Sequence, residues 1–132
     1  MPLKLKLKPH EKVLIAGALI TNGDAPAHIY VENKVPLLRE KDLIMEKDAR
    51  SICEKIYFVI QLMYFAPDNI KELHQLYWKH VRTLVSASPS TIELVSRISE
   101  SILVEKYYTA LKLARELIDY ERKLIRHAQQ SA

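Results

Sequence analysis

The chain opens with a strict alternation of apolar and cationic residues. From Leu3 to Lys8, leucines and lysines alternate without exception. Because successive side chains of a β-strand point to opposite faces, this stretch predicts a strand with one apolar face and one row of ammonium groups. We therefore expect the leucines to face a core and the lysines to face water.

Further strands are predicted before residue 45. An apolar run rich in branched side chains ends at Asn22-Gly23, a dipeptide that suits the positive φ angles of a tight hairpin turn. Pro36 has no backbone N–H to donate to a neighbouring strand, so the last strand should lie at an edge or begin there. The predicted strands are residues 3–8, 12–20, 27–32 and 35–39.

Beyond about residue 45 the apolar residues recur every three or four positions, which is typical of helices. Ser51 and Glu54 fit a capping box, in which the serine oxygen accepts a backbone amide and the glutamate reaches back. A second box fits residues 69–72, and Ser88-Pro89 can start the next helix, with residues 90–93 as an alternative box. The first two predicted helices span residues 51–66 and 70–87.

The segment after Pro89 contains no further proline or glycine. Residues 90–128 form either one very long helix or two helices with a bend at 99–101, and we expect two. The predicted fold class is α+β, a small N-terminal antiparallel β meander followed by three or four α-helices. We expect a β module at 1–45 and a helical region at 46–132 packed on it as one compact unit.

The composition is that of an ordinary folded protein, with 48% hydrophobic and 27% charged residues, which argues against wholesale disorder. The net charge of +4 is mild, but four of the first twelve residues are lysines, opposed there only by Glu11. The basic signal is therefore a local density at the N-terminus.

Cysteine usage and hydropathy predict a cytoplasmic protein. The single cysteine, Cys53, cannot form an intramolecular disulfide and lies in an apolar run, which suits a reducing compartment. Lysines interleave with the leucines at the N-terminus, unlike the pattern of a secretory signal. The longest apolar run, residues 56–66, is shorter than the roughly 20 residues that cross a bilayer, so no membrane association is expected.

The sequence predicts neither an enzyme nor a bound cofactor. With only Gly17 and Gly23, the chain cannot build a glycine-rich phosphate loop. Its five histidines include no i, i+4 pair and no nearby cysteine doublet, so no metal site is predicted. No nucleophile elbow frames a serine.

The lysine row has two explanations. Lysines on an edge strand discourage sheet-to-sheet aggregation, and lysines in a row can also follow the phosphates of a nucleic acid. Residue pattern alone leaves both open.

Several segments of the chain resemble the FlbT family of flagellar regulators. The similarity is collinear over nearly the whole length and includes Asn22-Gly23-Asp24, Leu38-Arg39-Glu40-Lys41-Asp42, Ile56-Tyr57-Phe58 and Tyr107-Tyr108-Thr109-Ala110-Leu111. The resemblance implies binding to the 5′ untranslated region of flagellin messenger RNA, promotion of its decay, and work alongside the partner FlaF. In two places the chain departs from the family pattern. Pro9-His10-Glu11 stands where Pro-Gly-Glu is usual, and Ala25-Pro26 stands where members often carry arginines.

The layout of residues 3–44 is also faintly similar to the small RNA-binding regulator CsrA. In that family the first strand and an arginine of a later segment meet across an intertwined dimer to grip RNA. The similarity groups Lys4 and Lys6 with Arg39.

We therefore expect one cationic surface for RNA. Strand residues two apart point the same way about 6.7 Å apart, so the lysines can follow the phosphates of a single strand. Arg39 can add specificity, because its planar fork can pair with a guanine edge. The expected RNA-binding residues are Lys4, Lys6, Lys8, Arg39 and Lys41.

The alternative function is a protein-interaction module that binds FlaF or flagellin through its helices without direct RNA contact. The apolar stripe of the last helix is wider than one packing contact needs, unless that helix simply packs in the same core. The expected partner-binding residues are Tyr108, Leu117 and Leu124. A homodimer through the β module is also expected, because a small meander leaves an open apolar edge.

Overall fold

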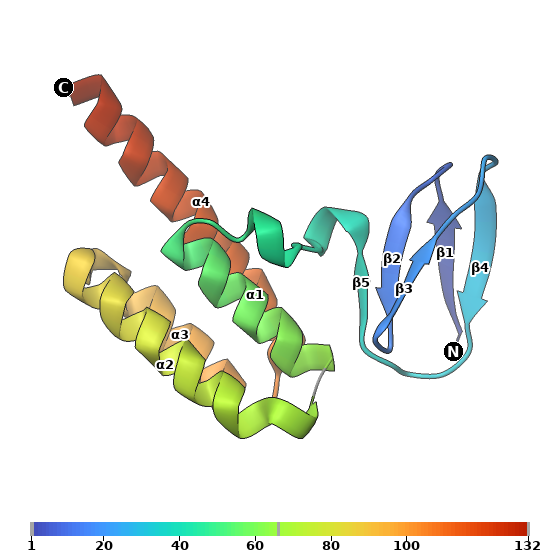
Figure 1. The fold of residues 1–132 in the computed structure, drawn as a ribbon, viewed down its shortest axis with the longest axis horizontal. Helices are drawn as coiled ribbons and strands as arrows, with labels where there is room; N and C mark the ends of the chain where they lie inside the picture. Colours follow the sequence, from blue (N-terminus) through green and yellow to red (C-terminus); the bar gives the residue numbers. More distant parts are fainter. Residues whose placement is uncertain (1, 66, 132) are drawn as a thin grey trace. The chain divides into compact units, whose positions relative to one another are not determined.

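The computed structural model describes residues 2–65 and 67–131. The chain divides into two compact units, the strands of Met1–Leu43 and the helices of Ile44–Ala132 (Figure 1). The predicted α+β class is confirmed, because antiparallel strands precede four α-helices within the described residues. The packing of the helical region on the strands stays a prediction.

The strands pair in an order that differs from a meander. β1 (Leu3–Leu7) pairs with β4 (Ala27–Val31) in one antiparallel sheet. In the other sheet, β2 (Lys12–Ile15) lies between β3 (Ala18–Thr21) and β5 (Leu37–Arg39). β2 and β3 are thus the consecutive strands that pair with each other, and β5 lies at an edge, as Pro36 predicts.

The predicted strand 12–20 is wrong, because a tight turn divides it into β2 and β3. Ala16 and Gly17 both have positive φ angles, 50° and 91°, which is the pattern of a type I′ hairpin turn. Gly23 lies outside the left-handed region. The side-chain amide of Asn22 instead donates to the carbonyl oxygens of Lys8 at 2.8 Å and Ala25 at 3.0 Å. The Asn22 side chain therefore bridges the turn between β1 and β2 and the loop between β3 and β4. Asn22-Gly23 does not form the predicted hairpin turn.

The alternation of β1 sorts its side chains as predicted. Leu5 and Leu7 are buried together with Val13 of β2, whereas Lys4 and Lys6 are exposed. Leu3, at the start of the strand, is half exposed. Partly buried hydrophobic residues packed against this cluster are Ile15, Ile29, Val31 and Leu37.

The helical unit contains α1 (Ile52–Phe65), α2 (Ile70–Ala87), α3 (Ile92–Leu103) and α4 (Tyr107–Ser131). α1 packs against α2 and α4, and α3 packs against α4 (Figure 1). Cys53 of α1 is fully buried, and burial together with the carboxylate of Glu121 in α4 raises the pKa of its thiol.

The capping box at the start of α1 is confirmed. The Ser51 amide donates to Oε1 of Glu54 at 2.9 Å, and the Glu54 amide donates to Oγ of Ser51 at 3.1 Å. The second predicted box is wrong, because the side chain of Asn69 makes no capping bond with any described residue. The side chain of Ser88 likewise forms no capping bond with any described residue. Its backbone carbonyl oxygen accepts a hydrogen bond from the Thr91 hydroxyl at 2.7 Å.

The predicted division of residues 90–128 into two helices is confirmed, but the break lies later than 99–101. The Lys106 amide donates to Ser101 O and the Glu105 amide to Ile102 O, which together form a Schellman motif. Glu105, with a φ of 59°, occupies the left-handed position where glycine is usual. Ser99 stays inside α3, buried, with its hydroxyl 2.8 Å from the Tyr77 hydroxyl.

The capping box makes a stability prediction. Ser51→Ala removes the acceptor of the Glu54 amide and should lower the free energy of unfolding by about 1 kcal/mol. Asn69→Ala is the matched control, because it removes a residue at the corresponding place in α2 that forms no side-chain cap. Urea unfolding of both variants checks this, and equal stabilities would contradict a role for the box.

Candidate nucleic-acid interface

A tight turn joins β1 to β2. The Glu11 amide donates to the Lys8 carbonyl oxygen at 3.1 Å, and His10 has a φ of 63°. Proline at the second position and a positive φ at the third define a type II turn, in which glycine is the residue without strain. His10 therefore occupies the one position of this turn that favours glycine.

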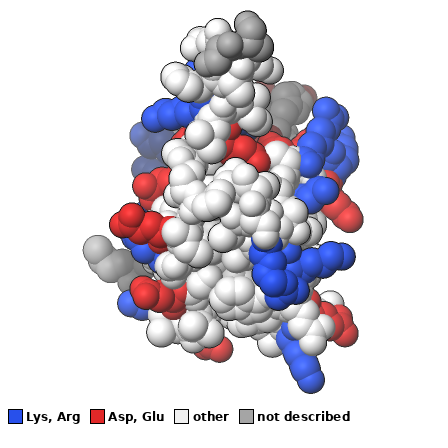
Figure 2. Space-filling view, turned by 90° about the vertical axis from the view of Figure 1, so that its left-hand side faces the viewer, with Lys and Arg blue, Asp and Glu red and all other residues white. Residues whose placement is uncertain are grey.

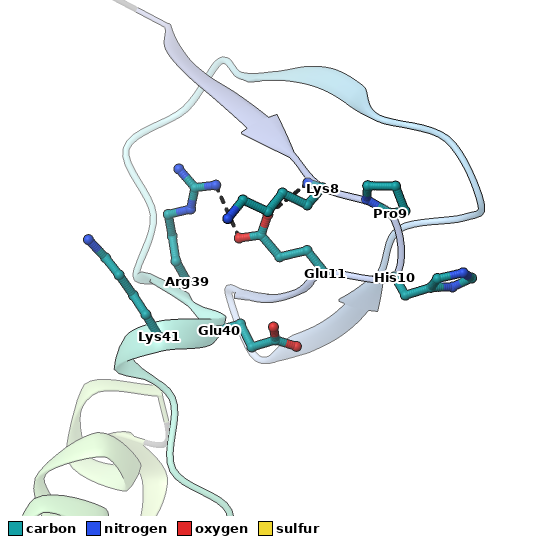
Figure 3. A pocket seen from close by; sticks show the side chains of 7 residues that line it. All are labelled: Lys8, Pro9, His10, Glu11, Arg39, Glu40 and Lys41. Atoms are coloured by element: carbon teal, nitrogen blue, oxygen red, sulfur yellow. Dashed lines mark hydrogen bonds and ion pairs between the residues drawn. The ribbon is translucent and has the colours of Figure 1, made fainter.

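Glu11 connects this turn to β5. Its carboxylate accepts the Lys8 amide at 2.8 Å and Nη2 of Arg39 at 3.1 Å (Figure 3). Nη2 of Arg39 also donates to the carbonyl oxygen of Lys6 at 2.6 Å. The Glu11 side chain is only 13% exposed and that of Arg39 is 34% exposed. The guanidinium is thus held against β1 by two acceptors.

This geometry changes the expected role of Arg39. The sequence predicts a fork that is open to a guanine edge, whereas in the structure Nη2 already donates to the Glu11 carboxylate and to the Lys6 carbonyl oxygen. A guanidinium has five N–H donors, and the two bonds use only this nitrogen. Any pairing with a base therefore has to use the remaining part of the fork, in an orientation that Glu11 sets.

The surroundings of Glu11 favour its charged form. The hydrogen bond from the Lys8 amide, followed by the bond and charge of Arg39, lowers the pKa of Glu11 from its usual value, against the opposing effect of burial. The ion pair with Arg39 is therefore present at neutral pH.

A cavity of about 600 Å³ opens beside this ion pair. Arg39 and Glu11 point toward each other in it, whereas His10 points away (Figure 3). Lys8, Arg39 and Lys41 bring three positive charges and Glu11 and Glu40 two negative ones, so one positive charge is in excess. The lining residues are Lys8, Pro9, His10, Glu11, Arg39, Glu40 and Lys41.

Lys4 and Lys6 lie on the outer face of the β1–β4 sheet and do not line the cavity. In the antiparallel register Lys4 lies opposite Tyr30, and Lys6 lies opposite His28. Nζ of Lys4 is 6.0 Å from the centre of the Tyr30 ring. The five expected RNA-binding residues thus fall into two neighbouring groups of one unit, a lysine row on β1 and a cavity at the end of that strand.

Sequence reasoning missed Glu11, His28 and Tyr30. The alternation in 27–32 puts His28 and Tyr30 on one face, and antiparallel pairing with β1 would have added them to the lysine row. Glu11 lies 28 residues from Arg39, so its role depends on the pairing of β2 with β5.

The expected partner-binding residues do not share one environment. Tyr108 is 45% exposed and Leu124 39% exposed, but Leu117 is fully buried in the helical core and cannot contact a partner there. Nζ of Lys112 lies 4.8 Å from the centre of the Tyr108 ring. Exposed Leu103 and Val104 precede it in sequence. On the face that Figure 2 shows, uncharged residues form a continuous area, and charged residues of both signs surround it and in places extend into it.

The described residues, 2–65 and 67–131, contain no group of three or more histidine, cysteine, aspartate or glutamate side chains that could hold a metal ion. No helix among them is both long and apolar enough to span a membrane.

The Glu11 contacts predict a pH dependence. Because the pKa of Glu11 is lowered in the folded state, its charged form adds stability above the usual carboxyl pKa of 4.5, and this contribution is lost as pH falls through the folded-state pKa. Glu11→Gln should therefore be less stable than the parent at pH 7, with a smaller difference at about pH 3. Urea unfolding at both pH values measures this. Glu32→Gln, on an exposed residue after β4, is the control, and a pH-independent difference for Glu11→Gln would contradict the ion-pair assignment.

Comparisons with known proteins place the chain in a family. The family model described as flagellar protein FlbT matches residues 3–125. The probable flagellum biosynthesis repressor protein FlbT 1 of Bradyrhizobium diazoefficiens is 40% identical over 125 residues, covering 94% of this chain and 85% of that protein. The flagellum biosynthesis repressor protein FlbT of Caulobacter vibrioides is 32% identical over 129 residues, covering 96% and 92% respectively. No solved structure matches the chain. The similarity extends over nearly the whole sequence, and the chain belongs to the FlbT family.

Proposed function

We propose that this protein represses flagellin synthesis by binding the 5′ untranslated region of flagellin messenger RNA and promoting its degradation. The names of its relatives, flagellum biosynthesis repressors, support the regulatory part of this proposal. The observation that carries the RNA part is the exposed lysine row of β1, which leads into the cationic cavity at Arg39.

The lysine row suits an extended single strand. Lys4 and Lys6 project from the same face of β1 and are about 6.7 Å apart along it. Lys8 follows them and lines the cavity. Ammonium groups in such a row bind successive phosphates without regard to sequence. This row supplies affinity in the proposed function.

Arg39 supplies discrimination in the same proposal. Its guanidinium is held by Glu11 and by the Lys6 carbonyl before any ligand binds, so less side-chain freedom is lost on binding. The nitrogens that these bonds leave aside can donate to the acceptors of a guanine edge. A fixed fork next to a phosphate-binding row favours one base over others at that position.

The alternative function is binding of FlaF or flagellin by the helical unit without RNA contact. Exposed apolar surface on the helical unit supports this alternative. It comes from Leu103, Val104 and Tyr108, which are close in sequence, and from Leu124 further along α4. The two functions differ in their dependence on salt. Affinity for RNA falls steeply with salt concentration as counterions are released, whereas an apolar contact between proteins does not behave in this way. In the proposed RNA-binding function, FlaF is a partner protein that works alongside this chain.

The lysine row predicts a change in salt dependence. The double variant Lys4→Ala/Lys6→Ala should bind all single-stranded RNAs more weakly, and the slope of log affinity against log salt should fall by about 1.4, at roughly 0.7 for each phosphate that a lysine no longer neutralises. Filter retention of a flagellin leader RNA and of a scrambled RNA measures both quantities. The control is Lys71→Ala/Lys79→Ala, which removes the same charge from exposed positions of α2. An unchanged slope in the folded β1 variant means that the lysines only protect an edge.

Arg39 predicts a change in discrimination. Arg39→Lys keeps the charge but loses the planar fork, so the preference for the leader over a scrambled RNA should fall by about 1–3 kcal/mol. The salt slope should stay near that of the parent, because the positive charge beside the phosphates is kept. Arg97→Lys, at an exposed position of α3, is the control. An undiminished preference in Arg39→Lys would place the specificity elsewhere.

The β unit predicts a homodimer. β3 lies at a sheet edge, all four of its residues are exposed, and Leu19 and Ile20 are 47% and 40% exposed. Pairing with a second copy covers such an apolar edge. Light scattering of the intact chain should give twice the monomer mass at tens of micromolar, an order of magnitude chosen because association depends on concentration. Ile20→Lys should shift the mass toward the monomer, and a monomeric parent would overturn this proposal.

A further inference from the structure

We infer that Tyr30 and His28 form a stacking site for unpaired bases on the outer face of the β1–β4 sheet. The inference rests on the proposed function and names the class of nucleic acid that this surface takes, which is single-stranded RNA with its bases turned toward the protein.

The register of the sheet places these side chains among the lysines. Lys4 pairs with Tyr30 and Lys6 with His28, and residues directly opposite in an antiparallel pair point to the same face. The intervening residues Leu5 and Ile29 point to the other face, toward the buried cluster. Two ammonium groups on β1 therefore lie beside two aromatic side chains on β4, all on one exposed surface.

The Tyr30 ring is open to a ligand. It is 56% exposed, and Nζ of Lys4 lies 6.0 Å from its centre. At that distance the ammonium attracts the ring face only weakly and lies within reach of a phosphate beside it. An exposed aromatic ring next to cations is the arrangement by which proteins bind single strands.

The spacing of the two side chains suits the bases of a single strand. Tyr30 and His28 are two residues apart on β4, which separates them by about 6.7 Å along the strand. This separation is about twice the 3.4 Å spacing of neighbouring bases along a strand, so each side chain can contact a separate base of an extended single strand. The neighbouring lysines are then beside the phosphates of the same nucleotide and the next.

This site distinguishes unpaired from paired RNA. In a duplex each base is already stacked on its neighbours and its faces are covered, so Tyr30 has no base face to contact. The phosphates are present in both forms. The lysines should therefore bind either form, and the two aromatic side chains should favour the single strand.

The competing explanation is that Tyr30 only packs against Lys4 as a cross-strand pair and stabilises the sheet. Two substitutions separate the explanations. Tyr30→Phe keeps the ring and removes the hydroxyl, whereas Tyr30→Leu keeps an apolar side chain and removes the ring. Loss of a stacked base should weaken single-strand binding about ten-fold for Tyr30→Leu while the salt slope stays constant, and Tyr30→Phe should bind like the parent.

A fluorescence experiment on the intact chain tests the contact directly. Trp78 is the single tryptophan, so Trp78→Phe combined with Tyr30→Trp leaves one indole, located in the proposed site. The probes are a ten-nucleotide oligoadenylate and the same strand annealed to oligouridylate. The single strand should quench the indole fluorescence, and the duplex should leave it nearly unchanged. Far-UV circular dichroism and thermal unfolding establish that each variant is folded.

The outcomes are distinct. If the single strand is retained by the parent protein but neither quenches the indole nor binds less well to Tyr30→Leu, the stacking site is overturned and the proposed RNA binding stands. If equal quenching is seen with the duplex, selection of unpaired bases is overturned. If the parent protein retains no RNA at low salt, the proposed function and this inference fall together. If Tyr30→Leu does not fold, the indole variant decides alone.

Discussion

The carboxylate of Glu11 joins parts of the β unit that no strand pairing connects. β1 belongs to one sheet, and β2 and β5 belong to the other. Glu11 accepts the amide of Lys8 after β1 and the guanidinium of Arg39 on β5, while Arg39 donates back to Lys6 of β1. A mostly buried carboxylate with charged and backbone donors makes stronger hydrogen bonds than a neutral acceptor would. The alignment of the lysine row with the cavity depends on this small network.

The same residues therefore hold the fold and form the candidate site. The amide of Lys8 fixes Glu11, whereas its side chain lines the cavity. Arg39 is fixed by one nitrogen and keeps the rest of its fork for other contacts. Because structure and recognition share these atoms, substitutions here affect both, and stability has to be measured beside RNA binding for every variant.

Local patterns in the sequence predicted what depends on local geometry. The alternation of β1 and the capping box of Ser51 and Glu54 both concern residues close in the chain, and both are confirmed. The hairpin turn was missed because Ala16-Gly17 lies inside an apolar run and Asn22-Gly23 is the stronger turn signal. Similarly, the end of α3 uses Glu105 in a left-handed conformation, and no glycine marks it.

Long-range features lay beyond such patterns. That Arg39 meets Glu11, and that Tyr30 lies beside Lys4, follows from which strands pair and in which register. Strand pairing across tens of residues is set by the total burial of the β unit and is only weakly encoded in any short segment. Similarly, Leu117 and Leu124 both belong to the apolar stripe of α4, yet only the packing of α1 and α3 against that helix buries Leu117 and leaves Leu124 partly exposed.

Burial of Cys53 between α1 and α4 makes its thiol a probe of local opening in the helical unit. Its thiol is fully buried, with a raised pKa, so the reactive thiolate is scarce and reagents cannot reach it while the helices are packed. Alkylation of this single cysteine can then proceed only when the contact between α1 and α4 opens. The rate of labelling in the native protein therefore reports how often the helical core opens.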